Sequence, residues 1–219
     1  MLEDVFPLEE LRNRFPDAKE FTLHGANHVP LLEQTQLDKL LVIGMQQWDR
    51  LVEWGPDKID PGALLKYTNK GGVNVVKFIS DTIRRPLIED LVYHRFTVER
   101  DHQEIIVAEY FLVVTYPNDL HFVYLNLANP DEPLPQEKRK WKFHHYEGLG
   151  LMRSIMNKVI ETGRKEGYRA LTMAPSAPAL RDYFIKEFGF EYSDTNTGRA
   201  GQKTDLLGTP VEITYKDYS

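Results

Sequence analysis

The chain has 219 residues, of which 42% are hydrophobic and 11% aromatic, so it can build a core and disorder is not the default expectation. It contains no cysteine, which excludes disulfides, thiolate metal sites and a cysteine nucleophile. The net charge of −6 disfavours nonspecific nucleic-acid binding and mildly favours cationic partners. The sequence has no apolar run of roughly 18 residues, the length that suggests a membrane span. Its acidic start, MLEDVFPLEELRNRF, does not resemble a secretory signal, so we expect a cytoplasmic protein.

The first 90 residues are predicted to be largely helical. Residues 19–25 could form a first strand, and from Leu31 the apolar residues fall largely on one helical face. Two prolines and two glycines in 54–62 end that helix. Residues 63–85 predict a second helical region, which is broken at Gly71-Gly72.

Three segments rich in β-branched and aromatic residues follow, at 90–100, 104–116 and 119–128. Short polar turns separate them, so we predict an antiparallel meander of three strands. The middle segment, EIIVAEYFLVVTY, is apolar at odd and even positions alike. It is therefore expected to be a central strand that is covered on both faces.

Residues 129–143 are rich in proline and then basic, and they predict a loop. Apolar residues from Leu149 to Ile160 then follow the spacing of an amphipathic helix. Gly163 and Gly167 are expected to mark the end of that helix, with Gly167 as its cap.

The rest of the chain predicts a buried strand at 168–174 and a helix at 177–188 that ends at Gly189. Two closing strands are expected at 190–194 and 210–218. The order of elements indicates a mixed α/β (α+β) sheet, in which the meander precedes a βαβ-like unit and helices cover both faces.

Two glycines, Gly148 and Gly150, open the predicted amphipathic helix. The first amides of a helix lack intrahelical partners and the helix dipole is positive there, so anions bind at this end. Glycine lets a phosphate approach the backbone closely, and a diphosphate would suit the site. Alternatively, the two glycines form only a tight turn and a close packing contact.

This glycine pair, at its place after the meander, resembles the GNAT superfamily of acyl-CoA-dependent N-acyltransferases. Members of that family carry a Gln/Arg-x-x-Gly-x-Gly/Ala loop that holds the CoA pyrophosphate. His145 stands here at the Gln/Arg position, and both glycines match. The resemblance covers about 90–219 and implies one GNAT-like domain over 1–219, with a divergent helical part at 1–90.

A second family segment, roughly Asn-x-x-Ala-x-x-x-Tyr followed by Gly-Phe, is similar to residues 176–190. Ser176, Ala179 and Tyr183 match in register, and Gly189-Phe190 supply the final pair. Two extra residues precede Gly189, so counting backwards places Ile185 at the tyrosine position instead. The resemblance implies that the residues that bind the coenzyme are Leu127, His145, Tyr146, Glu147, Gly148, Leu149, Gly150, Leu151 and Ser176.

The resemblance also implies the reaction, in which an acetyl or related acyl group moves from acyl-CoA, with acetyl-CoA as co-substrate, to a primary amine. The amine attacks directly and needs a base, while the departing thiolate needs a proton donor. Glu109 is the candidate base, because it interrupts an apolar strand where desolvation raises the pKa of a carboxylate. A solvated gap or an ion pair with Arg95 is the alternative, and Glu99 and Asn126 are weaker candidates. Tyr183 is the candidate acid, with helix packing as the alternative.

Other readings stay open at this stage. The basic run at 138–142 could hold the 3′-phosphate of CoA or a nucleic-acid acceptor, or it could be a solvated loop. The acceptor is expected to be a small molecule or a protein amine, and a nucleic acid is not favoured. A catalytically inactive GNAT-like binding module is a third alternative, and a homodimer is left open. The adjacent His144 and His145 lack the spacing of a metal site, so no metal is predicted.

Overall fold

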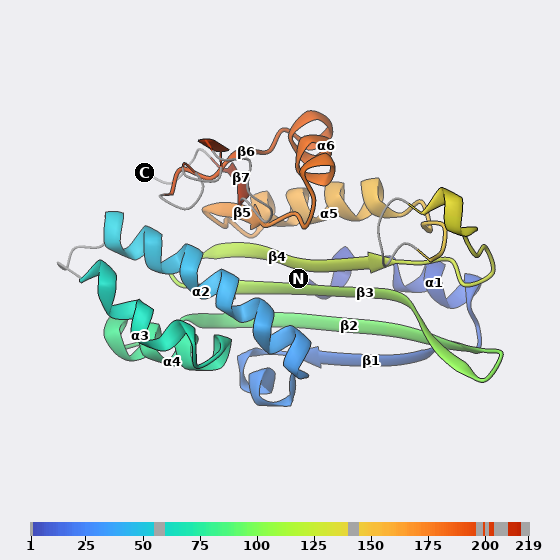
Figure 1. Cartoon of the computed structure of the whole chain (residues 1–219), viewed down its shortest axis with the longest axis horizontal. Coiled ribbons are helices and arrows are strands. Elements are labelled where there is room, and N and C mark those ends of the chain that lie inside the picture. The colour runs from blue at the N-terminus through green and yellow to red at the C-terminus, as the bar shows by residue number, and fades with distance from the viewer. Residues whose placement is uncertain are drawn as a thin grey trace.

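The computed structural model describes residues 2–54, 60–139, 145–195, 199, 202–203 and 210–215. These residues form a seven-stranded sheet with the order β1-β2-β3-β4-β5-β7-β6 (Figure 1). Strands β4 and β5 run parallel, and the other neighbouring strands of the described chain run antiparallel. The expected mixed α/β architecture is therefore confirmed.

The strands are β1 (Lys19–His24), β2 (Ile88–Arg100), β3 (Gln103–Thr115), β4 (Asp119–Leu127), β5 (Ala170–Met173), β6 (Glu191–Tyr192) and β7 (Val211–Thr214). The α-helices are α1 (Leu8–Arg14), α2 (Gln34–Trp54), α3 (Leu65–Thr68), α4 (Gly72–Ile83), α5 (Met152–Lys165) and α6 (Pro178–Phe188). Short 3-10 helices lie at η1 (Leu2–Val5), η2 (Ala26–Leu31), η3 (Pro61–Leu64) and η4 (Gln136–Lys138).

The meander of β2, β3 and β4 matches its prediction closely. Asp101 and His102 make the turn between β2 and β3 with positive φ angles of 50° and 62°. That conformation is typical of two-residue hairpin turns, and short polar residues tolerate it. The nine residues at the end of β3 are all buried, because this strand is covered on both faces as predicted.

Each face of the sheet carries its own core. On one face Phe96, Tyr110 and Leu112 pack with α5, α6 and the N-terminal segment. On the other, Tyr93 and Phe111 pack against α2, which crosses in front of the strands in Figure 1. Helices therefore cover both faces, as the sequence predicts.

One helix end differs from its prediction. Gly163 does not terminate α5 but lies buried within it. A Cβ at this position would lie 2.3 Å from the Tyr215 hydroxyl, which donates to the carbonyl of Ile160. Glycine is needed here for close packing. Gly167, with φ 73°, follows the end of the helix as expected.

A buried polar network joins α2 to the sheet at the end where β4 and β5 begin. The Asp119 carboxylate accepts from Arg50 at 2.8 Å, from Arg169 at 3.0 Å and from Gln47 at 3.0 Å. Arg50 also pairs with Glu212 on β7. Burial by itself would raise the pKa of Asp119, but the combined effect of Arg50 and Arg169 is larger and lowers this pKa. The network therefore links α2, β4 and β7 through paired charges.

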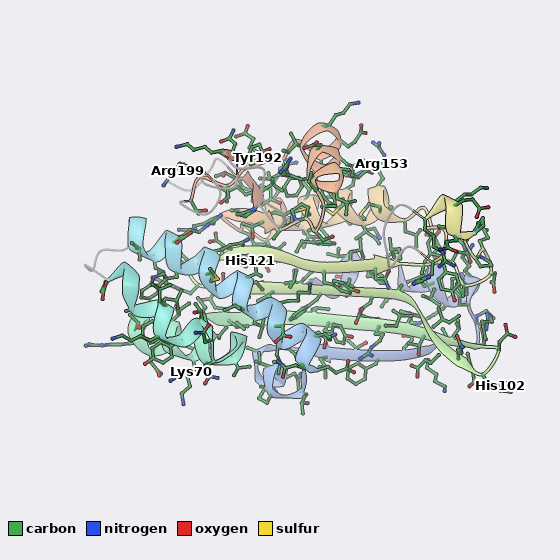
Figure 2. The ribbon with its side chains drawn as sticks, viewed as in Figure 1. Lys70, His102, His121, Arg153, Tyr192 and Arg199 are labelled. Atoms are coloured by element: carbon green, nitrogen blue, oxygen red, sulfur yellow. The ribbon has the colours of Figure 1, made fainter. Side chains whose placement is uncertain are left out.

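His121 lies next to this network, where α2 crosses β4 (Figure 2). Its Nε2 lies 2.8 Å from Gln47 Nε2 and 2.9 Å from the Thr115 hydroxyl, and its Nδ1 lies 2.5 Å from the Thr172 hydroxyl. Burial lowers the pKa of His121 to about 3. The neutral ring is therefore a structural part of this end of the sheet.

His94 makes the stability of the protein depend on pH. Its ring stacks on Phe96 and Tyr110, its Nδ1 lies 2.8 Å from the Thr22 hydroxyl, and burial lowers its pKa to about 4. The unfolded chain takes up this proton near its ordinary pKa of about 6.5, so the neutral ring stabilises the fold above that value. That stabilisation is lost as the pH falls through 6.5 toward 4, and it amounts to ~3 kcal/mol at most.

His94→Gln is therefore expected to flatten the fall in unfolding free energy between pH ~6.5 and ~4, measured by urea unfolding at several pH values. The control is His102→Asn, at the exposed β2–β3 turn, which should keep the steepness of the parent protein (Figure 2). Parallel curves for His94→Gln and the parent protein would contradict this account.

In the described residues no helix combines the length and apolar character needed to cross a membrane.

Candidate functional site

Strands β4 and β5 separate after a short parallel pairing. Their register runs from Asp119↔Ala170 to Phe122↔Met173, and β4 then continues alone to Leu127. A cavity of about 160 Å³ opens at this split. Its walls come from both strands, from the start of α5, and from α6 and α2. The lining residues are Lys39, Phe122, Val123, Tyr124, Leu125, Met152, Met173, Ala174, Pro175, Ser176, Leu180 and Phe184.

The cavity reaches both faces of the sheet. Phe122, Met152 and Phe184 belong to the core on the α5 side. Val123 and Tyr124 belong to the core on the α2 side. Side chains from both faces therefore contribute to the cavity wall.

A β-bulge marks the same place on β4. Phe111 pairs with Tyr124 and Leu112 with Phe122, so Val123 is the extra residue and has no partner on β3. A bulged residue leaves backbone groups outside the ladder. Beyond Phe122, β4 has also lost its β5 neighbour. Backbone groups of β4 are thus available at the cavity wall.

The segment before the glycine pair is held in place by residues 129–139, the proline-rich part of the predicted loop. Tyr146 bridges to Pro133, and three backbone hydrogen bonds of 2.8, 3.0 and 2.8 Å tie residues 145–147 to 129–134. Residues 129–139 were predicted as part of a loop, and they also contain the short helix η4. Their hydrogen bonds to residues 145–147 fix the position of the chain that leads into the glycine pair. Residues 140–144, which include most of the predicted basic run and His144, lie outside the described residues.

Gly148 and Gly150 are both exposed. Gly150 has φ 75°, a conformation that favours glycine. Gly148 has no positive φ, and a Cβ there would meet only the Leu127 carbonyl oxygen, at 4.0 Å. Backbone strain and close packing therefore give no reason for glycine at 148. Open access to the backbone is the remaining physical reason.

Helix α5 begins directly after this pair, and its N-cap residue, Leu151, makes no side-chain cap hydrogen bond. The first amides of the helix therefore depend on water or a ligand. The side chains of Leu149 and Leu151 are buried in the core. These side chains hold the loop against the core, so only the backbone groups of the two leucines could contact a ligand.

The remaining coenzyme candidates lie around the same region. Leu127 is half-buried at the end of β4, beneath Gly148. His145 and Glu147 are exposed, and Ser176 is exposed at the cavity. The structure thus places Gly148 beside the end of β4 and Ser176 at the cavity wall.

Arg14 is a residue that the sequence analysis missed. Its guanidinium Nη1 donates to the carbonyl of Leu149 at 3.3 Å, although 135 positions separate the two residues. This exposed side chain brings a positive charge to the glycine pair. No local pattern reveals it, because only tertiary packing places α1 beside α5.

Tyr183, the candidate acid, makes edge contacts with the rings of Phe184 and Phe188. Helix α6 lines the cavity with Leu180 and Phe184, and Tyr183 is not among the lining residues of the described chain. Its packing corresponds to the alternative that the sequence left open. Its catalytic role stays a prediction.

Glu109, the candidate base, is 4% exposed in the middle of β3. Its surroundings are polar rather than apolar, because its carboxylate accepts from the Tyr93 hydroxyl and from Gln36 Nε2 at 3.3 Å. Tyr124 stands diagonally across from Glu109 on the neighbouring strand, because Glu109 pairs with Asn126 and Phe111 pairs with Tyr124. Arg95 pairs with Glu33 at 2.5 Å instead, so the predicted alternative of a Glu109–Arg95 pair is not the observed ion pair.

Burial and Glu109 together shift the pKa values of the two tyrosines upward. Burial, then Glu109, raises the pKa of Tyr124 to about 12, and the pKa of Tyr93 rises for the same reasons. Tyr124 lines the cavity, and so does Lys39, whose Nζ lies 5.9 Å from the centroid of the Tyr124 ring. Neither residue was expected from the sequence. The bulge at Val123 brings Tyr124 diagonally across from Glu109, and the predicted meander contains no bulge.

A search of the described residues finds no group of three or more His, Cys, Asp or Glu side chains arranged to hold a metal ion.

Comparison with known proteins gives a likeness among solved structures. No family model and no curated protein matches the sequence. Among solved structures, the chain is similar to an acetyltransferase of the GNAT family from Staphylococcus aureus Mu50, with a TM-score of 0.30 and 12% identity. The alignment covers 90% of this chain and 100% of that one.

Proposed function

We propose that the chain is an acyltransferase that moves an acetyl or related acyl group from acyl-CoA to a primary amine. The observation that carries this proposal is the cavity at the β4–β5 split. Met152, the first residue of α5, lines it, and the open glycine pair lies just before that residue, while Lys39 and Tyr124 line the α2 side. A long ligand with a charged end at the glycine pair and a reactive end in the cavity suits this arrangement.

The phosphate end would be held at the glycine pair. Amides at the start of α5 have no side-chain cap, and the helix dipole favours an anion there. The exposed Gly148 gives the backbone room for a diphosphate, and Arg14 adds a cation beside it. The residues present therefore fit the diphosphate of CoA.

The acyl end would lie in the cavity. The walls formed by Phe122, Met173 and Phe184 are apolar and exclude water from a thioester. Backbone groups of β4 near Val123 are free of the β3 and β5 ladders, so an amide there can donate to an acyl carbonyl. The protein thus orients the thioester chiefly by shape and by backbone hydrogen bonds.

An amine would attack this thioester directly, a route that suits a chain without cysteine. Holding the two reactants in register supplies a large part of the rate enhancement. Glu109 is proposed as the base that takes the proton of the amine. Tyr183 stays the predicted donor to the thiolate, and Tyr183→Phe tests it by loss of kcat.

Thermal unfolding with ligands tests the proposal. Acetyl-CoA at about 100 times its Kd should add ~2.7 kcal/mol of stability, which raises the Tm by about 5 to 10 °C for a chain of this size. Acetylpantetheine, which has the same thioester but no diphosphate, should raise the Tm much less. If acetyl-CoA produces no shift at saturating concentration, the proposal fails.

A further inference from the structure

A polar cluster of four side chains lies on the α2 side of the cavity, and only part of it reaches the cavity wall. Its centre is the buried Glu109 carboxylate, which accepts hydrogen bonds from Tyr93 and Gln36, and Tyr124 stands diagonally across from it on β4. Tyr124 lines the cavity, whereas Glu109 is not among the lining residues of the described chain. A proton that leaves the cavity for Glu109 must therefore pass through another group.

We propose that the Tyr124 hydroxyl relays the proton of the acceptor amine from the cavity to the Glu109 carboxylate. This inference rests on the proposed function. In the step, the ammonium nitrogen gives a proton to the Tyr124 oxygen while the Tyr124 hydroxyl proton moves to a Glu109 oxygen. An ammonium and a carboxylate become a neutral amine and a carboxylic acid, and Tyr124 ends as it began.

The two reactants would enter the cavity from opposite sides, the acyl donor from the α5 side and the amine from the α2 side. The glycine pair and Met152 lie on the α5 side, where the acyl donor would enter. Lys39, Val123 and Tyr124 form the opposite wall next to α2. The amine would therefore approach from the α2 side and meet the Tyr124 hydroxyl before it meets the thioester.

The surrounding charges keep the phenol neutral. Burial, then Glu109, raises the pKa of Tyr124 to about 12, so the hydroxyl holds its proton until it receives another. The groups that face the cluster are Glu33 and Lys39 near and on α2, Tyr93 and Arg95 on β2, and Tyr124 on β4. Glu33 and Arg95 neutralise each other, which leaves Glu109 as the proton acceptor next to Tyr124.

Tyr124→Phe keeps the ring and removes the relay, and Tyr93→Phe is the matched control. Both changes delete one hydroxyl beside Glu109, but of the two tyrosines Tyr124 is the one that lines the cavity. The probes are acetyl-CoA with ethylamine, which is protonated at neutral pH, and with trifluoroethylamine, a far weaker base that is neutral there. Release of the CoA thiol reports the rate.

Tyr124→Phe should lower kcat/KM for ethylamine about 100-fold, whereas Tyr93→Phe should lower it by no more than about tenfold. The rate with trifluoroethylamine should change little in Tyr124→Phe, since that amine needs no deprotonation before attack. The acetyl-CoA shift in Tm should stay as in the parent protein.

The outcomes separate the two proposals. A parent protein that is not stabilised by acetyl-CoA overturns the proposed function. With that stabilisation present, equal losses in the two tyrosine variants overturn the relay, as does an equal loss with both amines. Failure of the parent protein to acetylate ethylamine also overturns it.

Discussion

Gly148→Asp is expected to weaken acetyl-CoA binding about 100-fold, which corresponds to roughly 3 kcal/mol, because a carboxylate would face the diphosphate. The fold should survive the change. Gly148 is exposed, has no positive φ, and has room for a side chain. A carboxylate near the start of α5 also interacts favourably with the helix dipole, so the ligand-free protein should be at least as stable. Isothermal titration and urea unfolding measure the two quantities.

Gly148→Asn is the matched control, since it adds nearly the same volume without the charge. It should bind acetyl-CoA markedly more tightly than Gly148→Asp does. Equal losses in the two variants would mean that bulk alone blocks the loop. Normal binding by Gly148→Asp would show that the diphosphate lies elsewhere.

Asp119→Ala is expected to lower the free energy of unfolding by ~3 kcal/mol, because it removes the buried carboxylate that Arg50 and Arg169 share and leaves the buried Arg50 with less negative charge around it. Asp119 is fully buried and binds Arg50 and Arg169, while Arg50 itself is 4% exposed. Urea unfolding monitored by circular dichroism measures the loss, and an unchanged m-value would show that the two-state transition is retained.

Asp182→Ala provides the comparison, because Asp182 also pairs with an arginine, Arg181, but lies at the surface. An exposed pair of this kind contributes up to about 1 kcal/mol. A loss for Asp119→Ala no larger than that of Asp182→Ala would mean that the buried network does not stabilise the sheet.

Local patterns predicted most of the elements. The meander, the helix now seen as α5 and the cap at Gly189 follow from periodicity and glycine placement, which depend on neighbouring residues. Gly163 was misread for a physical reason. Its role depends on Tyr215, a residue 52 positions away, and no local pattern carries that information.

The site was predictable only in part, for the same reason. The glycine pair is a contiguous motif, so its place before α5 could be expected. Arg14 reaches it from α1, and Gln36 reaches Glu109 from α2, across distances in sequence that only folding closes. The polar surroundings of Glu109 were missed because a strand sequence does not show what a distant helix donates to it.

The separation of β4 and β5 also bears on how the native protein opens. Four residue pairs join β5 to β4, whereas β2 and β3 are paired along most of their length. Local opening should therefore begin between β4 and β5, since fewer backbone hydrogen bonds must break there than within the meander. The ion pairs of Arg50 with Asp119 on β4 and with Glu212 on β7 connect the two sides of this boundary, so they control how often β5, β7 and β6 separate from the rest of the sheet.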